Sequence, residues 1–120
     1  MSYLEENAIT RLATVSGVDM KTAGATTLYT VPAGKTFIPI LVVVRNNSAS
    51  LAGGTEYDFT SWRQNVDIAD MTATTGYKPL WATDDAVYTP IAAGGAFQIT
   101  VVAGSTLDCT ATIDVFGYLI

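Results

Sequence analysis

Residues 109–120 read CTATIDVFGYLI, and the pattern of side chains changes halfway along this stretch. Up to Asp114 apolar and polar residues alternate, as they do in a strand with one face on a core and the other in water. After Asp114 the alternation ends, and residues 115–120 carry no charge. An antiparallel strand that is apolar on both faces needs cover on both. We therefore expect the C-terminal strand, residues 107–120, to meet the core with one face and another protein surface with the other.

A second strand, predicted over residues 36–45, has the same property in its stretch FIPILVVVR. Strict alternation would put two sets of side chains on opposite faces: Phe37, Leu41 and Val43 on one, and Ile38, Ile40, Val42 and Val44 on the other. Two doubly apolar strands in one short chain predict a subunit interface between copies of the chain. Its candidate residues are Leu41, Val43, Phe116, Tyr118 and Ile120. The alternative is that loops of the same chain cover these faces.

The composition also indicates an assembly. Hydrophobic residues make up 49% of the chain and charged residues only 14%, against roughly 25% in soluble domains. With a mean hydropathy of +0.32, there is too little charge to coat an ordinary monomer. The longest apolar run, residues 37–44, is far shorter than the ~18 residues of a membrane helix. We expect one domain over residues 1–120, oligomeric and without membrane insertion.

The charge balance excludes some partners. The net charge is −5, with six Lys and Arg in total, so no basic face is available for nucleic acid. The N-terminal residues MSYLEENAITR contain acids, whereas a signal peptide begins with basic residues followed by an apolar stretch. We therefore expect no signal peptide in this stretch. The single Cys109 falls on the apolar phase of its strand, which predicts a buried thiol.

Glycine- and proline-rich turns divide the chain into short segments rich in Thr, Val, Ile and aromatic residues, which favour strands. The predicted strands are residues 9–15, 26–31, 36–45, 55–62, 80–83, 86–91, 96–102 and 106–119. Their even spacing predicts an all-β antiparallel β-sandwich, and about eight strands in one domain suggest a jelly roll. Residues 46–54 are expected to form a surface loop and residues 63–79 a long one, both facing outward.

The sequence offers little for catalysis. It contains no histidine, which excludes His-based triads and His-ligated zinc, and we expect neither enzymatic activity nor a cofactor. Four carboxylates are weak calcium candidates, because hard cations prefer oxygen ligands: Asp67, Asp70, Asp84 and Asp85. Aspartates at turns are more commonly solvated or act as local caps.

Aromatic side chains around the 63–79 loop are the better candidates for ligand binding. The residues are Trp62, Tyr77, Trp81 and Tyr88. Aromatic rings beside carboxylates could hold a sugar by stacking and hydrogen bonding, and Tyr and Trp also anchor protein interfaces. The third interpretation is that these rings belong to an ordinary core.

Two stretches resemble known proteins. The segment with Phe116, Gly117, Tyr118 and Leu119 resembles the terminal strand of the jelly rolls of tumour necrosis factor and C1q, which closes the domain beside a threefold axis. Residues 27–49, TLYTVPAGKTFIPILVVVRNNSA, resemble a segment recurrent in bacteriophage and virus-type structural proteins.

These resemblances imply a homotrimeric structural or adhesive subunit of a phage-type virion, as a decoration, fibre-head or tail protein. They do not fix the location but favour a virion or the outside of the cell, with other virion proteins or a cell-surface glycan as candidate partners. The alternative is a carbohydrate-binding module that uses the aromatic residues named above.

Overall fold

The computed structural model describes residues 9–71, 77–82 and 90–120, and every element within these ranges is a strand. The strands are β1 (Thr10–Asp19), β2 (Gly24–Thr30), β3 (Phe37–Arg45), β4 (Glu56–Phe59), β5 (Arg63–Val66), β6 (Tyr77–Trp81), β7 (Ala96–Ala103) and β8 (Thr110–Leu119). In these ranges no helix has the length and apolar character that a membrane span requires.

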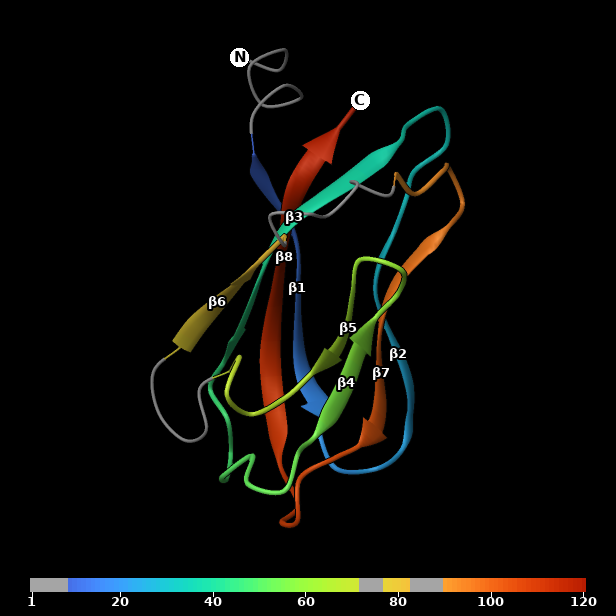
Figure 1. Cartoon of the computed structure of the whole chain (residues 1–120). Coiled ribbons are helices and arrows are strands. Elements are labelled where there is room, and N and C mark those ends of the chain that lie inside the picture. Colours follow the sequence, from blue (N-terminus) through green and yellow to red (C-terminus); the bar gives the residue numbers. More distant parts are fainter. Residues whose placement is uncertain (1–8, 72–76, 83–89) are drawn as a thin grey trace.

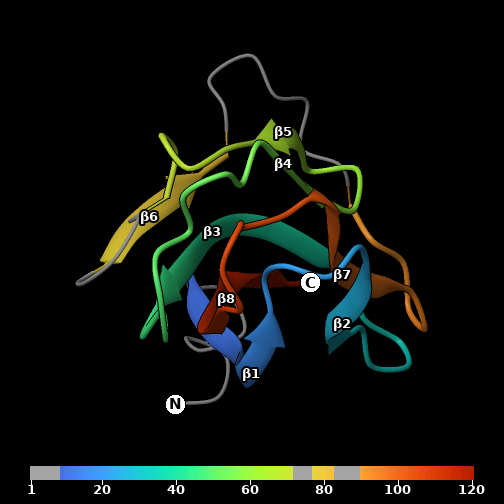
Figure 2. The same ribbon diagram turned by 90° about the horizontal axis from the view of Figure 1, so that it is seen from below.

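The strands form two four-stranded antiparallel sheets (Figure 1). One sheet has the order β1-β8-β3-β6 and is called here the β8 sheet; the other has the order β2-β7-β4-β5 and is called the β7 sheet. Seen from below, the two sheets lie on opposite sides of the molecule, which is the arrangement of a β-sandwich (Figure 2). The all-β sandwich predicted from the sequence is confirmed.

The pairing of the strands is nested. β1 pairs with β8, β2 with β7, β3 with β6, and β4 with β5, so the two halves of the chain run antiparallel to each other like one long hairpin. Successive pairs alternate between the two sheets. This eight-stranded, two-sheet order is that of a jelly roll, with its two Greek keys.

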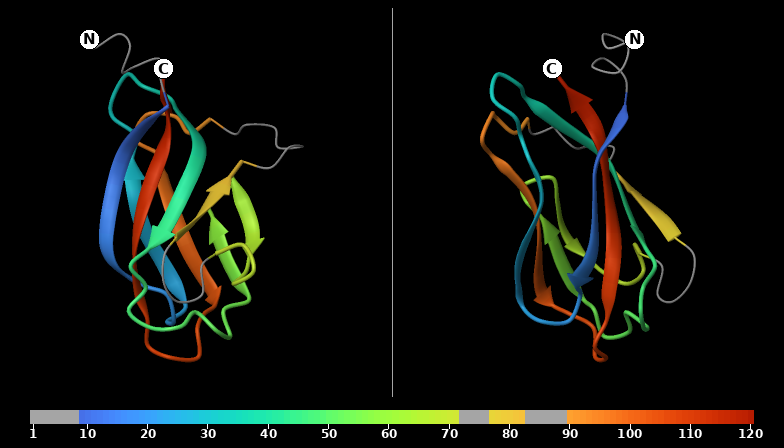
Figure 3. Two further views of the ribbon diagram at one scale, coloured as in Figure 1. Left: turned by 90° about the vertical axis from the view of Figure 1, so that its left-hand side faces the viewer. Right: turned by 180° about the vertical axis from the view of Figure 1, so that it is seen from behind.

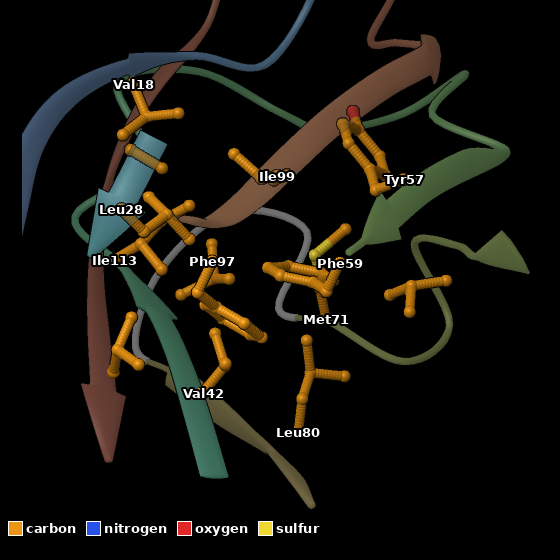
Figure 4. Close-up of a cluster of buried hydrophobic side chains, with 14 of the residues drawn as sticks. Val18, Leu28, Val42, Tyr57, Phe59, Met71, Leu80, Phe97, Ile99 and Ile113 are labelled. Carbon is orange, nitrogen blue, oxygen red and sulfur yellow. The ribbon is translucent and has the colours of Figure 1, made fainter. Parts of the chain in front are cut away.

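The core lies between the sheets and is dominated by aromatic and β-branched side chains (Figure 4). Phe97 of β7 is its centre, with ring centroids 5.7 Å from Phe37, 5.8 Å from Trp62 and 6.3 Å from Phe59. Edge-to-face and offset contacts at such distances add to the stabilisation from burial. Cys109 is 3% exposed and joins this cluster, which confirms the prediction of a buried thiol.

A bulge in β3 changes which of its side chains face the core. The register against β8 shifts between Pro39 and Leu41, where β3 has one extra residue. As a result Phe37, Val42 and Val44 all belong to the core cluster. The predicted grouping of Phe37 with Leu41 and Val43 is therefore wrong, because strict alternation does not survive an inserted residue.

The chain reverses at residues 60–62, where the sequence predicted a continuous strand over residues 55–62. Thr60 has φ +47°, and its hydroxyl accepts a hydrogen bond from Gln98 N at 2.7 Å. β5 then begins at Arg63, so the predicted long loop over residues 63–79 is wrong at its start; it also ends inside β6. The predicted strand over residues 86–91 falls almost wholly outside the described residues, and its last residue, Ile91, forms an isolated bridge with Phe37.

The 46–54 connection is not entirely a surface loop. Leu51 is fully buried in the core, and Gly54 is also buried. A Cβ on Gly54 would lie 2.5 Å from the hydroxyl oxygen of Tyr57, which donates a 2.8 Å hydrogen bond to the Met20 carbonyl. The loop therefore contributes to the core at this end of the sandwich.

Gly117 allows β8 and β3 to approach closely at the end of the β8 sheet. It pairs with Pro39, and a Cβ at this position would collide with the carbonyl oxygen of Ile38 and lie 2.5 Å from Cε1 of Phe37. The glycine between Phe116 and Tyr118 is thus required by backbone packing.

Replacing Gly117 with alanine should lower the free energy of unfolding by roughly 1–3 kcal/mol, the usual cost of overpacking. Thr110→Ala, on the exposed start of the same strand, should change it by about 0.5 kcal/mol or less. Urea unfolding of both variants and the wild type provides the measurement. Equal midpoints for Gly117→Ala and the wild type would contradict the close approach.

Candidate functional site

The outer face of the β8 sheet carries a row of large apolar side chains that crosses three of its strands. Phe116 of β8 lies opposite Leu41 of β3, and Leu41 lies opposite Trp81 of β6. On the other side, Phe116 lies opposite Arg11 of β1. The left view of Figure 3 looks onto this sheet and shows its strands in the order β1, β8, β3, β6.

Neighbouring positions extend the row into a continuous surface. Val43 lies opposite Pro79, and Ile38 lies opposite Tyr118. We call this surface the apolar face; it consists of Ile38, Leu41, Val43, Pro79, Trp81, Phe116 and Tyr118. Ile120 continues it beyond the end of β8 and is 61% exposed, while its N–H bonds to the Thr36 carbonyl at 2.9 Å.

Burial distinguishes this surface from the core behind it. On β8, Ile113 and Val115 are fully buried in the core cluster, whereas the alternate residues Phe116 and Tyr118 are only partly buried and lie outside that cluster. Val43 is 9% exposed, yet it too is outside the core cluster. Trp81 is 54% exposed. β3 and β8 thus have one face in the core and the other outside the core cluster. That another protein surface covers this second face stays a prediction.

The outer face of the β7 sheet is different in character. Asp58 of β4 lies opposite Thr100 of β7, and Gln98 donates a 3.0 Å hydrogen bond to Thr27 of β2. Glu56 lies beside Asp58 on the same face, and burial together with the neighbouring Asp58 charge raises the pKa of Glu56. One large apolar residue of this face, Val102, is exposed, with 49% of its surface accessible. This face has the polar character of a surface in water.

A polar cluster borders the apolar face. Asp114 of β8 accepts hydrogen bonds from Nε of Arg45 and from the hydroxyl of Thr14, both at 2.7 Å. A second guanidinium nitrogen of Arg45, Nη2, lies 3.3 Å from the other carboxylate oxygen. The cluster links three adjacent strands of the sheet, since Thr14 is on β1, Asp114 on β8 and Arg45 on β3.

Asp114 is ionised within this cluster although it is only 5% exposed. Burial by itself would raise its pKa, but the hydrogen bonds from Arg45 and Thr14 and the charges of Arg45 and Arg11 outweigh that effect. The pKa of Asp114 therefore lies below its usual value. The pKa of Arg45 is raised by the same contact. Every carboxylate oxygen of Asp114 thus has a donor from its own chain.

The four aromatic candidates do not form one binding surface among the described residues. Trp62 is 7% exposed and packs on Phe59 and Phe97, so it belongs to the core. Trp81 stands on the apolar face. Tyr77 is placed only by its backbone, opposite Arg45 in register, and Tyr88 lies outside the described residues.

The carboxylates of Asp67 and Asp70 accept hydrogen bonds from backbone N–H groups of their own turn. Asp67 accepts a 2.9 Å hydrogen bond from Ala69 N, and Asp70 accepts one of 3.1 Å from Asp67 N. Asp70 is also 3.7 Å from Arg63, which donates to the Trp81 carbonyl at 3.4 Å and so connects β5 to the edge strand β6. In the part of the chain that the structure describes, no three metal-ligating side chains gather; Asp84 and Asp85 lie outside it.

Comparisons of this chain with known protein families, with curated proteins and with solved structures found no match. The jelly-roll order does not select a function either, since such folds serve many. The functional argument therefore depends on the chain's own surfaces.

The ionised state of Asp114 makes stability depend on pH. Because its pKa is lower in the folded protein than in the unfolded chain, its contribution is complete above about pH 4 and is lost as the pH falls through the folded pKa. Asp114→Asn should therefore be less stable than the wild type near neutral pH, and the difference should narrow at about pH 2.5. Urea unfolding at the two pH values measures this.

Asp108→Asn is the matched control, since the Asp108 side chain is 99% exposed and 3.4 Å from Lys21. Asp19, whose pKa is lowered by hydrogen bonds from the Thr22 and Lys21 backbones, is present in all three proteins and cancels in the differences. If the difference in free energy of unfolding between Asp114→Asn and the wild type is the same at both pH values, the lowered pKa of Asp114 is contradicted.

Proposed function

We propose that this chain is a non-enzymatic structural subunit that assembles with copies of itself through the apolar face. The observation that carries the proposal is the row in which Phe116, Leu41 and Trp81 stand side by side across three strands, outside the core. Full burial of such a side chain contributes roughly 1.5–3 kcal/mol. Contiguous apolar surface outside the core is typical of interaction sites; here Trp81 is exposed, and Phe116 and Leu41 are partly exposed.

The distribution of charge favours a second copy as the occupant. The chain has a net charge of −5, and contact through the β7 sheet would bring Glu56 and Asp58 of two copies together. On the apolar face the acid is Asp114, which Arg45 already neutralises, and Arg11 adds a positive charge beside it. Two copies can therefore meet there without repulsion between carboxylates.

The resemblances described above support three as the number of copies and a virion as the setting. The Phe116–Leu119 segment resembles the strand beside the threefold axis of jelly rolls like those of tumour necrosis factor and C1q, and in this chain its residues Phe116 and Tyr118 belong to the apolar face. The resemblance of residues 27–49 to phage and virus-type proteins supports a decoration, fibre-head or tail subunit. In this proposal the homotrimer forms through strands β3 and β8.

The mass in solution tests the assembly. Light scattering after size exclusion should give about 38 kDa, three times the 12.7 kDa of the chain. Phe116→Asp or Tyr118→Asp should give about 12.7 kDa, because an unpaired charge is too costly to bury in the seam.

Val102→Asp is the matched control, because it places the same charge on an exposed apolar position of the β7 sheet. It should keep the wild-type mass. A wild type of monomeric mass, or Phe116→Asp and Tyr118→Asp variants that keep an oligomeric mass, would contradict the proposal.

Carbohydrate recognition is the second candidate, and the 54% exposure of Trp81 is the observation in its favour. A glycan array with the wild type and Trp81→Ala separates the two functions. Assembly predicts no specific glycan signal for either protein and a weaker oligomer for Trp81→Ala. A specific glycan signal that Trp81→Ala abolishes, with the mass unchanged, would support the binding module instead.

A further inference from the structure

We propose that Arg45, Asp114 and Thr14 set the register in which the apolar face meets a second copy of this chain. The inference rests on the function proposed above and adds to it the residues that make the contact specific. It starts from the position of the cluster: Asp114 lies opposite Val43, two residues before Phe116 on the same strand. A partner that covers Phe116 and Leu41 also covers the cluster.

Apolar contact alone does not fix how two such faces align. The hydrophobic effect is non-directional and depends mainly on the area removed from water, so a flat apolar sheet face permits several sliding arrangements of similar free energy. Buried polar groups remove this freedom, because each one left without a partner is penalised. Single polar residues in apolar seams are known to specify register in this way.

The hydrogen bonds of the cluster show what it can offer to a partner. The carboxylate of Asp114 is satisfied by Arg45 and Thr14, so it can enter a dry contact without losing a donor. Arg45 has five N–H donors, of which two are directed at Asp114, and its side chain is 33% exposed. The arrangement that leaves Arg45 satisfied is the one in which an oxygen acceptor of the neighbouring copy reaches the remaining donors.

The charge of the cluster also matters for the second copy. Arg45 and Asp114 neutralise each other, so the pair brings no net charge into the seam. Removal of the Asp114 charge alone would leave the Arg45 guanidinium inside the contact without its counter-ion. Loss of one partner of a buried, hydrogen-bonded charge pair weakens association strongly.

The experiment is sedimentation equilibrium at neutral pH on the wild type, Asp114→Asn and Asp108→Asn. Asp114→Asn should raise the dissociation constant of the oligomer at least about 30-fold. Asp108→Asn makes the same charge change on an exposed side chain away from the face and should leave the constant unchanged. Far-UV circular dichroism confirms that each variant is folded.

A double variant, Arg45→Met with Asp114→Leu, covers the case in which Asp114→Asn does not fold. Apolar replacement of both partners leaves no orphaned charge and is often neutral for stability. This variant should fold and associate but give several masses instead of one, because the register is no longer specified.

The outcomes separate the two proposals. A monomeric wild type contradicts assembly and this inference together. An oligomeric wild type whose mass and dissociation constant are both retained in Asp114→Asn, or in the double variant, contradicts this inference and leaves assembly standing.

Discussion

The pairing of β8 with both β1 and β3 is the constraint on which the structure depends. β8 is the inner strand that joins the first strand of the chain to the apolar strand β3, and its inward residues Ile113 and Val115 are fully buried. Its outward residues present Phe116 and Tyr118 to the other side. The same ten residues therefore contribute to the core and to the apolar face.

Two local features adjust that pairing. The bulge at Pro39–Leu41 brings Val42 and Val44 into the core with Phe37, and it leaves Leu41 and Val43 beside Phe116 and Asp114. Gly117 lets the β3 backbone and the Phe37 ring lie against β8. Without the extra residue, one part of β3 would face the wrong side, because a one-residue shift exchanges the faces of a strand.

The fold class could be predicted from the sequence because alternation, β-branched residues and glycine-containing turns all agree in most segments. The reversal at Thr60 could not, since FTSW contains neither glycine nor proline and a threonine rarely adopts a positive φ. Its hydrogen bonds to Gln98, 38 residues away, stabilise that conformation. The strand boundaries were predicted less well: β5 begins where a long loop was predicted, and residues 86–89 of another predicted strand lie outside the described residues.

The apolar face could be predicted in part. The doubly apolar strands pointed to Leu41, Val43, Phe116 and Tyr118, but Pro79 and Trp81 join them only through the register of β6. The alternation in YKPLW was the available signal for these two. The cluster of Asp114, Arg45 and Thr14 had no local signal, because its members are 69 and 100 residues apart in the chain.

The nested pairing has a consequence for biosynthesis. β1 is synthesised well before its partner β8, and Thr14 meets Asp114 only after 100 further residues. At a translation rate of 5–20 residues per second, this interval is roughly 5–20 s. For the later part of that time, after β3 is synthesised, β3 lacks β8 as a neighbour. Pairing of β3 with β8 is therefore delayed until the end of this stretch, and the delay follows from the order of the strands.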